Sequence, residues 1–238
     1  YGGIVIHKKT KLSDFISIAK SVFEYLNAEQ FQKINFKEIP HIYTQIPSDE
    51  LQYLMFLMQG NLVRRDVLSV LDLSNNFAFS RDRKNGIKRG FKNDLVVKEE
   101  SNFESFWNEI LIPNLEAKHQ AKPVHSLDEI QYLYSKFPKN IRQFNVYQND
   151  KIVAGTIVFD TDLVAHSQYI SGNSDKNELG SLDFLHDYLI SNVFKDKKYF
   201  DFGISNENQG KNINEGLLYW KESFGARSIT QDFYEVNI

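Results

Sequence analysis

Apolar residues return along this chain at two spacings, one typical of helices and the other typical of strands. Between residues 11 and 26 they recur every three or four positions, which predicts an amphipathic helix. Residues 31–39 alternate between apolar and polar and predict a strand that ends before Pro40. The same patterns predict strands at residues 3–6 and 62–73, and a helix over residues 49–58 that Ser48 caps and Gly60 ends.

The rest of the chain continues this alternation of helices and strands. Ser126 and Glu129 form a capping box ahead of an apolar run, which predicts a helix that extends to Phe137. Turn residues at 149–150 and 161–162 divide residues 141–171 into three strands of an antiparallel meander. Further predicted elements are strands at 95–98, 199–204 and 228–236, a helix at 102–118 that Pro113 kinks or splits, and a helix at 181–194. Such an order indicates an α/β (α+β) layered fold.

One stretch, residues 198–226, combines a strand, a polar loop and a helix. Phe200 and Phe202 share one face of the strand, and Asp201 points to the other face. After the polar loop, a helix begins near Asn214 and ends at Gly225. Its expected buried positions are Leu217, Leu218, Trp220 and Phe224. Polar groups that meet at the carboxyl end of a strand are typical of an α/β ligand site, and a solvated connection is the alternative.

Composition excludes several classes of function. Hydrophobic residues make up 42% and charged residues 25% of the 238 residues, which is ordinary for a globular protein. The net charge of −3 gives no global basic field for nucleic acid. Cysteine is absent, which excludes disulfides, thiolate metal ligands and a thiol nucleophile. Because no membrane-spanning run or signal peptide is found and the histidines are scattered, we expect a cytoplasmic protein without a metal.

Residues 80–93 contain the one basic cluster of the sequence. Its cations fall within about three to four helical turns, and Gly86 and Gly90 weaken that helix by roughly 1 kcal/mol each. The cluster is suited to phosphate groups of coenzyme A, of a nucleotide-linked sugar or of a tRNA acceptor stem, and a solvated helix face is the alternative. The cations are Arg81, Arg83, Lys84, Lys88, Arg89 and Lys92.

Residues 200–226, FDFGISNENQGKNINEGLLYWKESFGA, resemble the C-terminal signature of FemAB-like acyltransferases in the GNAT superfamily. That signature is a strand ending in fDFG.S, then E..G..lNeGL...K.gFGa, then a final strand. The segment around His125 resembles a second element of the family, H..kPvHS.eE. The C-terminal match is carried by Asp201, Phe202, Gly203, Ser205, Glu207, Gly210, Asn214, Glu215, Gly216, Leu217, Lys221, Phe224, Gly225 and Ala226.

The resemblance implies a GNAT-like fold with a mixed, mostly antiparallel central sheet flanked by helices, in two GNAT-like halves. We place an N-terminal half at residues 1–95 and a C-terminal acyltransferase domain at residues 96–238. Because Tyr1, Gly2 and Gly3 lead directly into a predicted strand, we expect the first half to lack its start. In GNAT proteins the strand matching residues 163–171 separates from its neighbour to admit the acyl donor.

Strict alternation on that strand divides its side chains between two faces. His166, Gln168 and Ile170 are expected on one face, and Ala165, Ser167, Tyr169 and Ser171 on the other. The resemblance points to Tyr169 as the residue that orients the donor or passes a proton. A purely structural place in the core is the alternative.

Acyl transfer to an amine needs few protein groups, because the donor is already activated as a thioester or ester. The protein orients the amine, accepts its proton and stabilises the oxyanion. We expect Asp201 or Glu215 to accept the proton, and the resemblance implies Lys221 as the group that stabilises negative charge. The other expected substrate-binding residues are Arg64, Arg65, Lys88, His125, His166, Asn214 and Tyr219. For His125, a structural hydrogen-bonding role is the alternative.

GNAT enzymes bind the coenzyme A pyrophosphate at the turn before the helix that matches residues 181–194. The usual pattern, Gln/Arg-x-x-Gly-x-Gly/Ala, is met here only by Gly180 and Ser181, with Gly172 at the start of the turn. We therefore expect acyl-CoA as the co-substrate and keep aminoacyl-tRNA as the alternative.

The expected function is that of a bacterial N-acyltransferase. It would move an acetyl or aminoacyl group to an amine or amino-sugar acceptor in cell-envelope or surface-polysaccharide synthesis. The alternatives are an aminoacyl-tRNA-dependent transferase that forms peptidoglycan bridges and a non-catalytic GNAT-like binding module. The sequence leaves the acceptor and the oligomeric state open.

Overall fold

The computed structural model describes residues 3–238, except for the side chains of Lys118 and His119. The expectations for Tyr1 and Gly2 lie outside the described residues. The chain forms two compact units, and each draws on segments that are far apart in the sequence. Unit 1 comprises Tyr1–Leu68, Ile204–Glu215 and Ser228–Ile238, and unit 2 comprises Ser69–Gly203 and Gly216–Arg227. These units differ from a division of the chain at residue 95.

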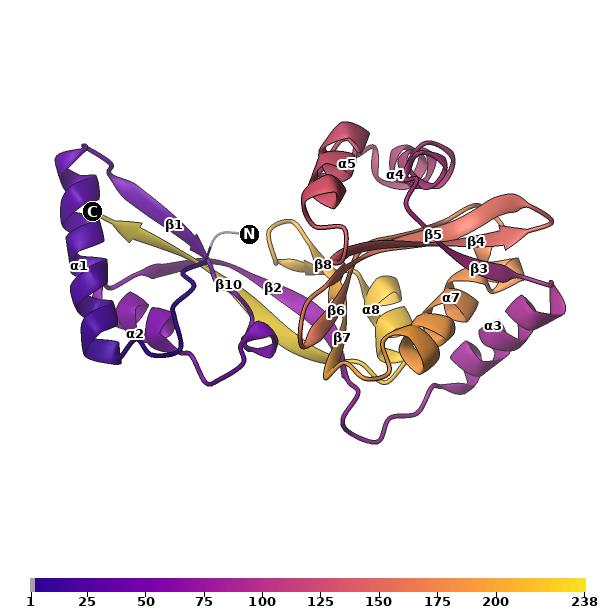
Figure 1. Cartoon of the computed structure of the whole chain (residues 1–238), viewed down its shortest axis with the longest axis horizontal. Coiled ribbons are helices and arrows are strands. Elements are labelled where there is room, and N and C mark those ends of the chain that lie inside the picture. Colours follow the sequence, from indigo (N-terminus) through magenta and orange to yellow (C-terminus); the bar gives the residue numbers. More distant parts are fainter. Residues whose placement is uncertain (1–2) are drawn as a thin grey trace. The chain divides into compact units, whose positions relative to one another are not determined.

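In unit 1, helices pack on one face of a small sheet (Figure 1). β10 (Arg227–Asn237) lies between β1 (Lys33–Lys37) and β2 (Asn61–Asp72), and its pairing with β1 is antiparallel. α1 (Leu12–Ala28) and α2 (Glu50–Leu57) close the core over this face. The core consists of Phe15, Ala19, Phe23, Phe36, Leu54, Met55 and Val236.

Two short elements complete unit 1. They are the 3-10 turn η1 (His41–Tyr43) and a hairpin of β8 (Asn206–Glu207) and β9 (Asn212–Ile213). The predicted helix at residues 11–26 and the predicted strands at 31–39, 62–73 and 228–236 are confirmed, with ends that move by a few residues.

α2 uses different capping residues from those predicted. The hydroxyl of Ser48 donates to Glu50 Oε2 at 2.9 Å, and Asp49 takes the N-cap position. At the other end Gln59 adopts the left-handed conformation, with φ of 52°, and the N–H of Gly60 donates to the Met55 carbonyl at 2.8 Å. This is a Schellman motif in which glutamine, not glycine, holds the strained position.

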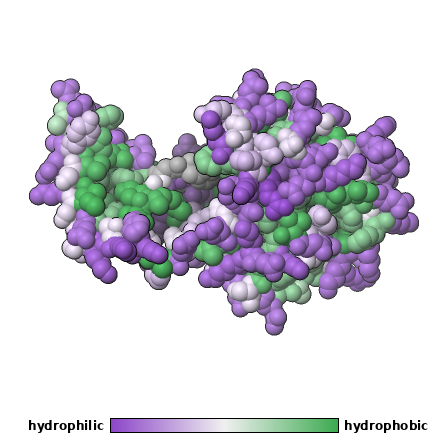
Figure 2. All heavy atoms as spheres, viewed as in Figure 1, coloured by the Kyte–Doolittle hydropathy of each residue, from purple (hydrophilic) through white to green (hydrophobic). Residues whose placement is uncertain are grey.

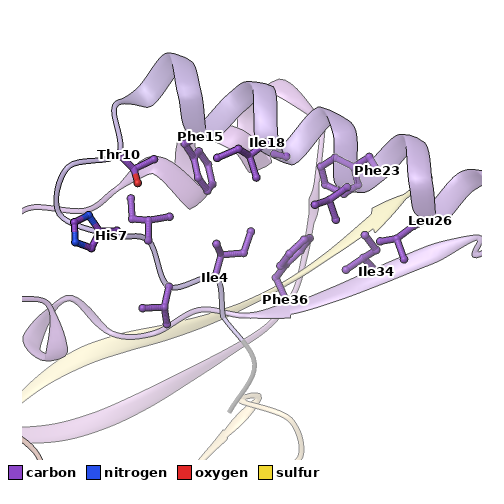
Figure 3. A pocket seen from close by; sticks show the side chains of 13 residues that line it. Ile4, His7, Thr10, Phe15, Ile18, Phe23, Leu26, Ile34 and Phe36 are labelled. Atoms are coloured by element: carbon purple, nitrogen blue, oxygen red, sulfur yellow. The ribbon is translucent and has the colours of Figure 1, made fainter.

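The strand predicted at residues 3–6 is wrong. These residues are irregular, and Ile4 and Ile6 line an apolar pocket of about 380 Å³ against α1 and β1 (Figure 3). Apolar side chains also gather on this part of the surface of unit 1 (Figure 2), where Ile18 and Val22 are exposed. Alternating apolar residues therefore face a helix here and do not pair with a strand.

Unit 2 contains a mixed sheet that continues from the end of β2. The strands that follow, in spatial order, are β7 (Tyr199–Ile204), β6 (Val164–Gly172), β5 (Lys151–Asp160), β4 (Ile141–Gln148) and β3 (Val96–Glu100). β3 to β6 pair antiparallel, and β6 pairs parallel with β7. The predicted mixed, mostly antiparallel sheet and its meander are confirmed. Asn149 and Asp150 both have positive φ, as a two-residue hairpin turn requires.

Helices cover both faces of this sheet (Figure 1). One face carries α3 (Arg81–Lys92), α6 (Lys176–Leu179), α7 (Ser181–Tyr188), η3 (Leu189–Val193) and α8 (Glu215–Glu222). The other face carries η2 (Phe106–Leu111), α4 (Ile112–His119) and α5 (Leu127–Lys136). None of the described helices combines the length and the apolar content needed to cross a bilayer.

Proline and serine mark helix ends in unit 2, and the predicted capping box at Ser126 is confirmed. The helix expected at residues 102–118 is split, because Pro113 has no N–H to donate to the Glu109 carbonyl and a π-helical turn precedes it. Ser80 caps α3, and Ser126 with Glu129 forms the capping box of α5.

The glycines of α3 form a contact surface. A Cβ atom at Gly86 would lie 1.7 Å from Asp183 Oδ2, and one at Gly90 would lie 2.5 Å from Phe184 Cβ. The close packing of α3 on α7 therefore depends on both glycines. This close packing also explains why glycine, a poor helix former, occurs twice in the middle of α3.

Candidate functional site

β6 and β7 run side by side only at their beginnings. Their parallel pairing extends from Val164 opposite Tyr199 to His166 opposite Asp201, whereas β6 continues to Gly172 alongside β5. The two strands therefore part at their carboxyl ends, as the resemblance implied for the strand at residues 163–171. In a sheet with parallel strands, this is where polar side chains and ligands meet.

A β-bulge in β6 changes which side chains share a face. Ile157 of β5 lies opposite Tyr169, and the next residue, Val158, lies opposite Ser167, so Gln168 is the extra residue. His166 lies opposite Phe159 and therefore shares the face of Tyr169. The predicted separation of His166 from Tyr169 is wrong, because strict alternation fails at Gln168. Ile170, in turn, joins the face of Ala165 and Ser167.

Asp201 is the fully buried centre of one group of polar side chains. Its Oδ2 lies 2.9 Å from His166 Nδ1, and its Oδ1 accepts the backbone N–H of Gly203 at 2.7 Å. Gly203 has φ of 74°, a conformation that folds the end of β7 back toward the carboxylate. A Cβ atom at this position would lie 3.4 Å from His166 Cε1, an ordinary contact distance, so the positive φ, and not space, is what requires glycine here.

Lys221 brings a buried amine to the same place. Its side chain donates to the Gly203 carbonyl at 3.0 Å, and the residue is only 2% exposed. Burial lowers the pKa of Lys221 to about 7, while the Asp201 carboxylate opposes this shift. Near neutral pH this amine therefore exists in both protonation states, which is common at functional sites and rare for a surface lysine.

Helix α8 reaches this arrangement with a register that differs from the prediction. Leu217, expected to be buried, is 38% exposed, and Lys221 takes a core-facing position instead. Leu218 and Trp220 are half-buried, and Phe224 is fully buried. The apolar stripe of this short helix is thus interrupted by a lysine that faces Asp201.

Tyr169 and His125 form a second hydrogen-bonded pair. The Tyr169 oxygen lies 2.6 Å from His125 Nδ1 and accepts the backbone N–H of His125 at 3.2 Å. The Tyr169 ring packs edge-on against Trp107, with ring centres 5.1 Å apart. Burial raises the pKa of Tyr169, which keeps the phenol protonated. Tyr169 is therefore a core residue whose hydroxyl points at a half-exposed histidine.

Gln168 lies next to both groups. Its Oε1 lies 3.1 Å from His166 Nε2. Its side chain also lowers the pKa of the Tyr169 phenol, against the larger effect of burial, which raises it. We call the resulting set the relay cluster; it consists of Lys221, Asp201, His166, Gln168, Tyr169 and His125. All six lie in unit 2.

The relay cluster unites most of the predicted catalytic residues with two predicted substrate-binding histidines. Sequence reasoning missed Gln168 as a member, since a bulge becomes visible only in the pairing of strands. Asp201 and Lys221 are sealed from solvent, whereas the His166 side chain is 12% exposed and His125 is half-buried. A substrate would therefore meet the histidines first.

Other predicted site residues in the C-terminal stretch make contacts of their own. The Asn214 amide donates to Glu207 Oε1 at 2.8 Å, and Glu215 is exposed at the start of α8; both belong to unit 1. The Tyr219 hydroxyl donates to Asp82 Oδ2 at 2.7 Å and ties α8 to α3. Their roles in substrate binding or catalysis stay predictions.

The basic residues expected to hold phosphate are found in both units. Arg64 makes two hydrogen bonds to Asp66, and Arg65 makes two to Asp232, so both guanidinium groups of unit 1 already have carboxylate partners. Lys88 is exposed on α3 in unit 2. Binding of phosphate by these residues stays a prediction.

The turn before α7 packs tightly against α3. Gly180 has φ of 70°, and a Cβ atom there would lie 2.1 Å from the Gly86 carbonyl oxygen. Ser181 is fully buried, and a Cβ atom at Gly172 would lie 2.9 Å from Lys176 Cβ. The role of these three residues in holding a donor stays a prediction.

No protein-family model matches this sequence, and no curated protein matches it either. Among solved structures, FemX superposes with a TM-score of 0.71 over 96% of this chain and 77% of FemX, at 9% identity. The C-terminal domain of a putative lysylphosphatidylglycerol synthetase from Agrobacterium fabrum gives 0.62 over 94% and 73%, at 13% identity. A tandem GNAT protein from the clavulanic acid biosynthesis pathway gives 0.51 over 98% and 73%, at 10% identity.

Proposed function

We propose that this chain, which has the FemAB-like, GNAT-type acyltransferase fold, is an N-acyltransferase whose active site is the relay cluster. The observation that carries the proposal is the pair of hydrogen-bonded groups, Asp201 with His166 and Tyr169 with His125, that lies where β6 and β7 part, with the buried Lys221 beside Asp201. It supplies both a proton acceptor and a proton donor, which are the two groups that acyl transfer to an amine requires.

His166 and Asp201 take the proton of the attacking amine. The amine nitrogen attacks the acyl carbon, a C–N bond forms, and the nitrogen loses a proton to Nε2 of the imidazole, which exchanges its contact with Gln168 for the amine. Asp201 is too deeply buried to touch the acceptor, but it holds Nδ1 of His166 at 2.9 Å and stabilises the imidazolium that forms. This arrangement favours Asp201 over the exposed Glu215 as the carboxylate that assists the base.

Tyr169 supplies the proton that the leaving group needs. When the C–S or C–O bond to the donor breaks, the thiolate or alkoxide takes the phenolic hydrogen. His125, 2.6 Å from the same oxygen, is placed to return a proton from solvent. His166 then releases its proton to solvent. The products are an amide and the protonated leaving group, so protons balance over the cycle.

Lys221 balances the charge around Asp201. A buried carboxylate without a cation nearby is costly, and His166 provides such a cation only while it holds the extra proton. With a pKa lowered to about 7 by burial, Lys221 can be charged or neutral as His166 changes state. Its role in stabilising negative charge is thus exerted through Asp201.

For substrates we propose acyl-CoA as the donor and an amine or amino sugar as the acceptor. The setting would be cytoplasmic synthesis of the cell envelope or of a surface polysaccharide. The FemX-like fold and the tandem GNAT relative support a transferase of this general kind.

Calorimetric titration with acetyl-CoA tests the donor. Saturable binding in the micromolar range is expected, followed by transfer of a labelled acetyl group to members of an amino-sugar panel. Lys221→Met should lower kcat by about 100-fold, the lower end for loss of a group that stabilises charge in an active site. The exposed Lys195→Met is the matched control and should be unaffected. Absence of binding by the folded chain, or full activity of Lys221→Met, would contradict the proposal.

An aminoacyl-tRNA is the second candidate donor, and the basic surface of α3 favours it. Arg81, Lys84, Lys88 and Lys92 are all exposed at spacings of three or four residues, so they line one side of the helix. Arg83 is the exception, because it turns inward to Asp183. A stripe of cations suits a phosphate backbone better than it suits a single small anion.

The salt dependence of binding separates the two donors. If α3 binds tRNA, the logarithm of the association constant should fall with the logarithm of salt concentration, and each removed phosphate contact should reduce that slope by about one. The triple variant Lys84→Gln, Lys88→Gln, Lys92→Gln is the test. The triple variant Lys8→Gln, Lys9→Gln, Lys20→Gln, also exposed, is the control. If the two triple variants show the same salt dependence, the basic surface of α3 does not bind the tRNA.

A further inference from the structure

The pocket between α1 and β1 in unit 1 is lined almost entirely by hydrocarbon. It has a volume of about 380 Å³, and of the 13 residues that line it only His7 and Thr10 are polar (Figure 3). A polar ligand would lose its hydrogen bonds to water here and find few replacements. The lining therefore favours a ligand whose buried part is a hydrocarbon chain.

The polar and apolar parts of the pocket are separated along its length. His7 and Thr10 lie together at the end where α1 begins, and Leu26 and Ile34 lie at the opposite end (Figure 3). Between Phe15 and Leu26, α1 rises by about 16 Å, at about 1.5 Å per residue. One leaflet of a bilayer has a similar depth, half of a hydrocarbon core of about 30 Å. The pocket thus matches one lipid acyl chain in length and in polarity.

Apolar side chains at the rim of the pocket face solvent. Val5 is 81% exposed, and Ile18 and Val22 are exposed on the side of α1 that lines the pocket. The apolar surface of unit 1 seen in Figure 2 includes this region. An acyl chain laid in the pocket would remove these side chains from water without burying a charged group.

Three cations lie beside the polar end of the pocket. Lys8, Lys9 and Lys11 follow His7 in the loop before α1, and all three are exposed. None of them forms an ion pair with a described residue, and the first carboxylate along the chain is that of Asp14. The whole chain has a net charge of −3, so this cluster is a local feature. Its charge is complementary to an anionic lipid head group.

We propose that unit 1 docks on an anionic lipid surface, with one acyl chain in the pocket and the head group beside Lys8, Lys9 and Lys11. A peptide is a poorer occupant, because its backbone N–H and C=O groups would be buried where only His7 and Thr10 offer polar partners. An acyl chain combined with a basic patch is a pair of signals that together hold a protein on a membrane. This docking requires no acyl transfer, since the relay cluster belongs to unit 2.

Flotation of the full chain with lipid vesicles tests the charge part of the proposal. The chain should float with vesicles of phosphatidylcholine and phosphatidylglycerol in equal parts, and much less with phosphatidylcholine alone. Each lysine near an anionic leaflet strengthens binding roughly five-fold, so removal of all three should weaken it about 100-fold. The test variant is Lys8→Gln, Lys9→Gln, Lys11→Gln, and the matched control, exposed on unit 2, is Lys136→Gln, Lys139→Gln, Lys195→Gln.

The same assay tests the apolar part. Ile18→Gln with Val22→Gln should weaken binding about 20-fold, because each side chain has roughly half of its surface left to bury against lipid. Tyr53→Gln with Phe56→Gln, also exposed but on α2 and outside the pocket, should bind as the wild type does. All four positions are exposed, so the fold should tolerate the changes, which circular dichroism checks.

Magnetic resonance of labelled isoleucine methyl groups tests the orientation of the chain in the pocket. In nanodiscs of the same lipids, a spin label at the end of the acyl chain should broaden the Ile34 methyl signals more than a label on the head group does. The reverse order would overturn the proposal, and so would absence of vesicle binding or equal losses in a test variant and its control. A wild-type chain that self-associates through Ile18 and Val22 without binding vesicles would assign the pocket to a second copy instead.

Discussion

Unit 2 contains two clusters of polar side chains that each combine an aspartate, a cation and a histidine. They differ in which of these members are exposed to solvent. The relay cluster has a carboxylate, a cation, two histidines, a carboxamide and a phenol. The second group, which we call the helix cluster, consists of Arg83, Asp183, Trp220 and His186 and lies among α3, α7 and α8. Each has a buried aspartate as its centre.

In the helix cluster the groups that could exchange protons are buried: His186 is fully buried and Asp183 is 6% exposed, while Arg83 and Trp220 are partly exposed. Asp183 binds Arg83 and accepts Trp220 Nε1–H at 2.8 Å. The His186 ring lies 5.0 to 6.0 Å from the rings of Phe200, Phe202, Trp220 and Phe224. Burial among them lowers the pKa of His186 to about 4, so this histidine is neutral at ordinary pH.

The relay cluster, by contrast, opens to the surface through its histidines. His166 and His125 are partly exposed, while Asp201 and Lys221 lie behind them. The comparison shows that a buried aspartate with a cation and a histidine does not in itself make a reactive site. Reactivity also requires that one member of the set can exchange protons with a substrate or with solvent.

The largest expected effect concerns the helix cluster. Asp183→Ala leaves the Arg83 guanidinium buried without its carboxylate, and loss of one partner of a buried pair costs about 3–5 kcal/mol of unfolding free energy. Urea unfolding should show this loss, while kcat per folded molecule stays unchanged. Asp196→Ala, at an exposed position, should change stability by less than about 0.5 kcal/mol. A stable Asp183→Ala chain would show that the cluster is not structural.

The second effect is a dependence of stability on pH that belongs to His186. Because its pKa is lowered in the folded chain, the unfolded chain binds a proton first as pH falls below about 6.5. The contribution of His186 to the free energy of unfolding is complete above pH 6.5. It falls by about 3 kcal/mol between pH 6.5 and pH 4 and changes little below pH 4. Glu38, whose pKa burial raises to about 7, acts in the opposite direction over an overlapping range.

Comparison with His186→Phe isolates this contribution, since Glu38 is common to both chains. The difference in unfolding free energy between the variant and the wild type should shift by about 3 kcal/mol in favour of the variant between pH 6.5 and 4. A difference that stays constant with pH would mean that the buried histidine is charged in the folded state or is reached by water.

The third effect concerns two tyrosines, one in the relay cluster and one on the surface of α1. Tyr169→Phe removes the proposed acid and should lower kcat by about 100-fold with the melting temperature nearly unchanged. Tyr25→Phe, at an exposed position, is the matched control. Equal activity of the two variants would return Tyr169 to a purely structural role beside Trp107.

Most of the fold is predictable from local patterns. The meander at residues 141–171, the capping box at Ser126 and the split at Pro113 each depend on residues close together in the sequence. The errors arise where distant segments decide the outcome. Residues 3–6 alternate like a strand but pack beneath α1, and Gly86 serves α7, which lies about a hundred residues further along the chain.

The site was predictable as a set of residues but not as an arrangement. The resemblance pointed to Tyr169, Asp201 and Lys221 individually, but it did not predict which side chains they contact. Alternation along β6 put His166 and Tyr169 on opposite faces, because a bulge depends on the register with β5 and leaves no mark in the spacing of side chains. For the same reason Gln168 carried no signal of its own.

A side-by-side assay of two histidine variants tests the central claim most directly. His166→Gln should lose acyl transfer by at least about 100-fold while keeping the wild-type unfolding free energy within about 1 kcal/mol. His186→Phe should keep acyl transfer and change only the dependence of stability on pH. Loss of transfer in His186→Phe with full activity in His166→Gln would contradict the account and move the active site to the helix cluster.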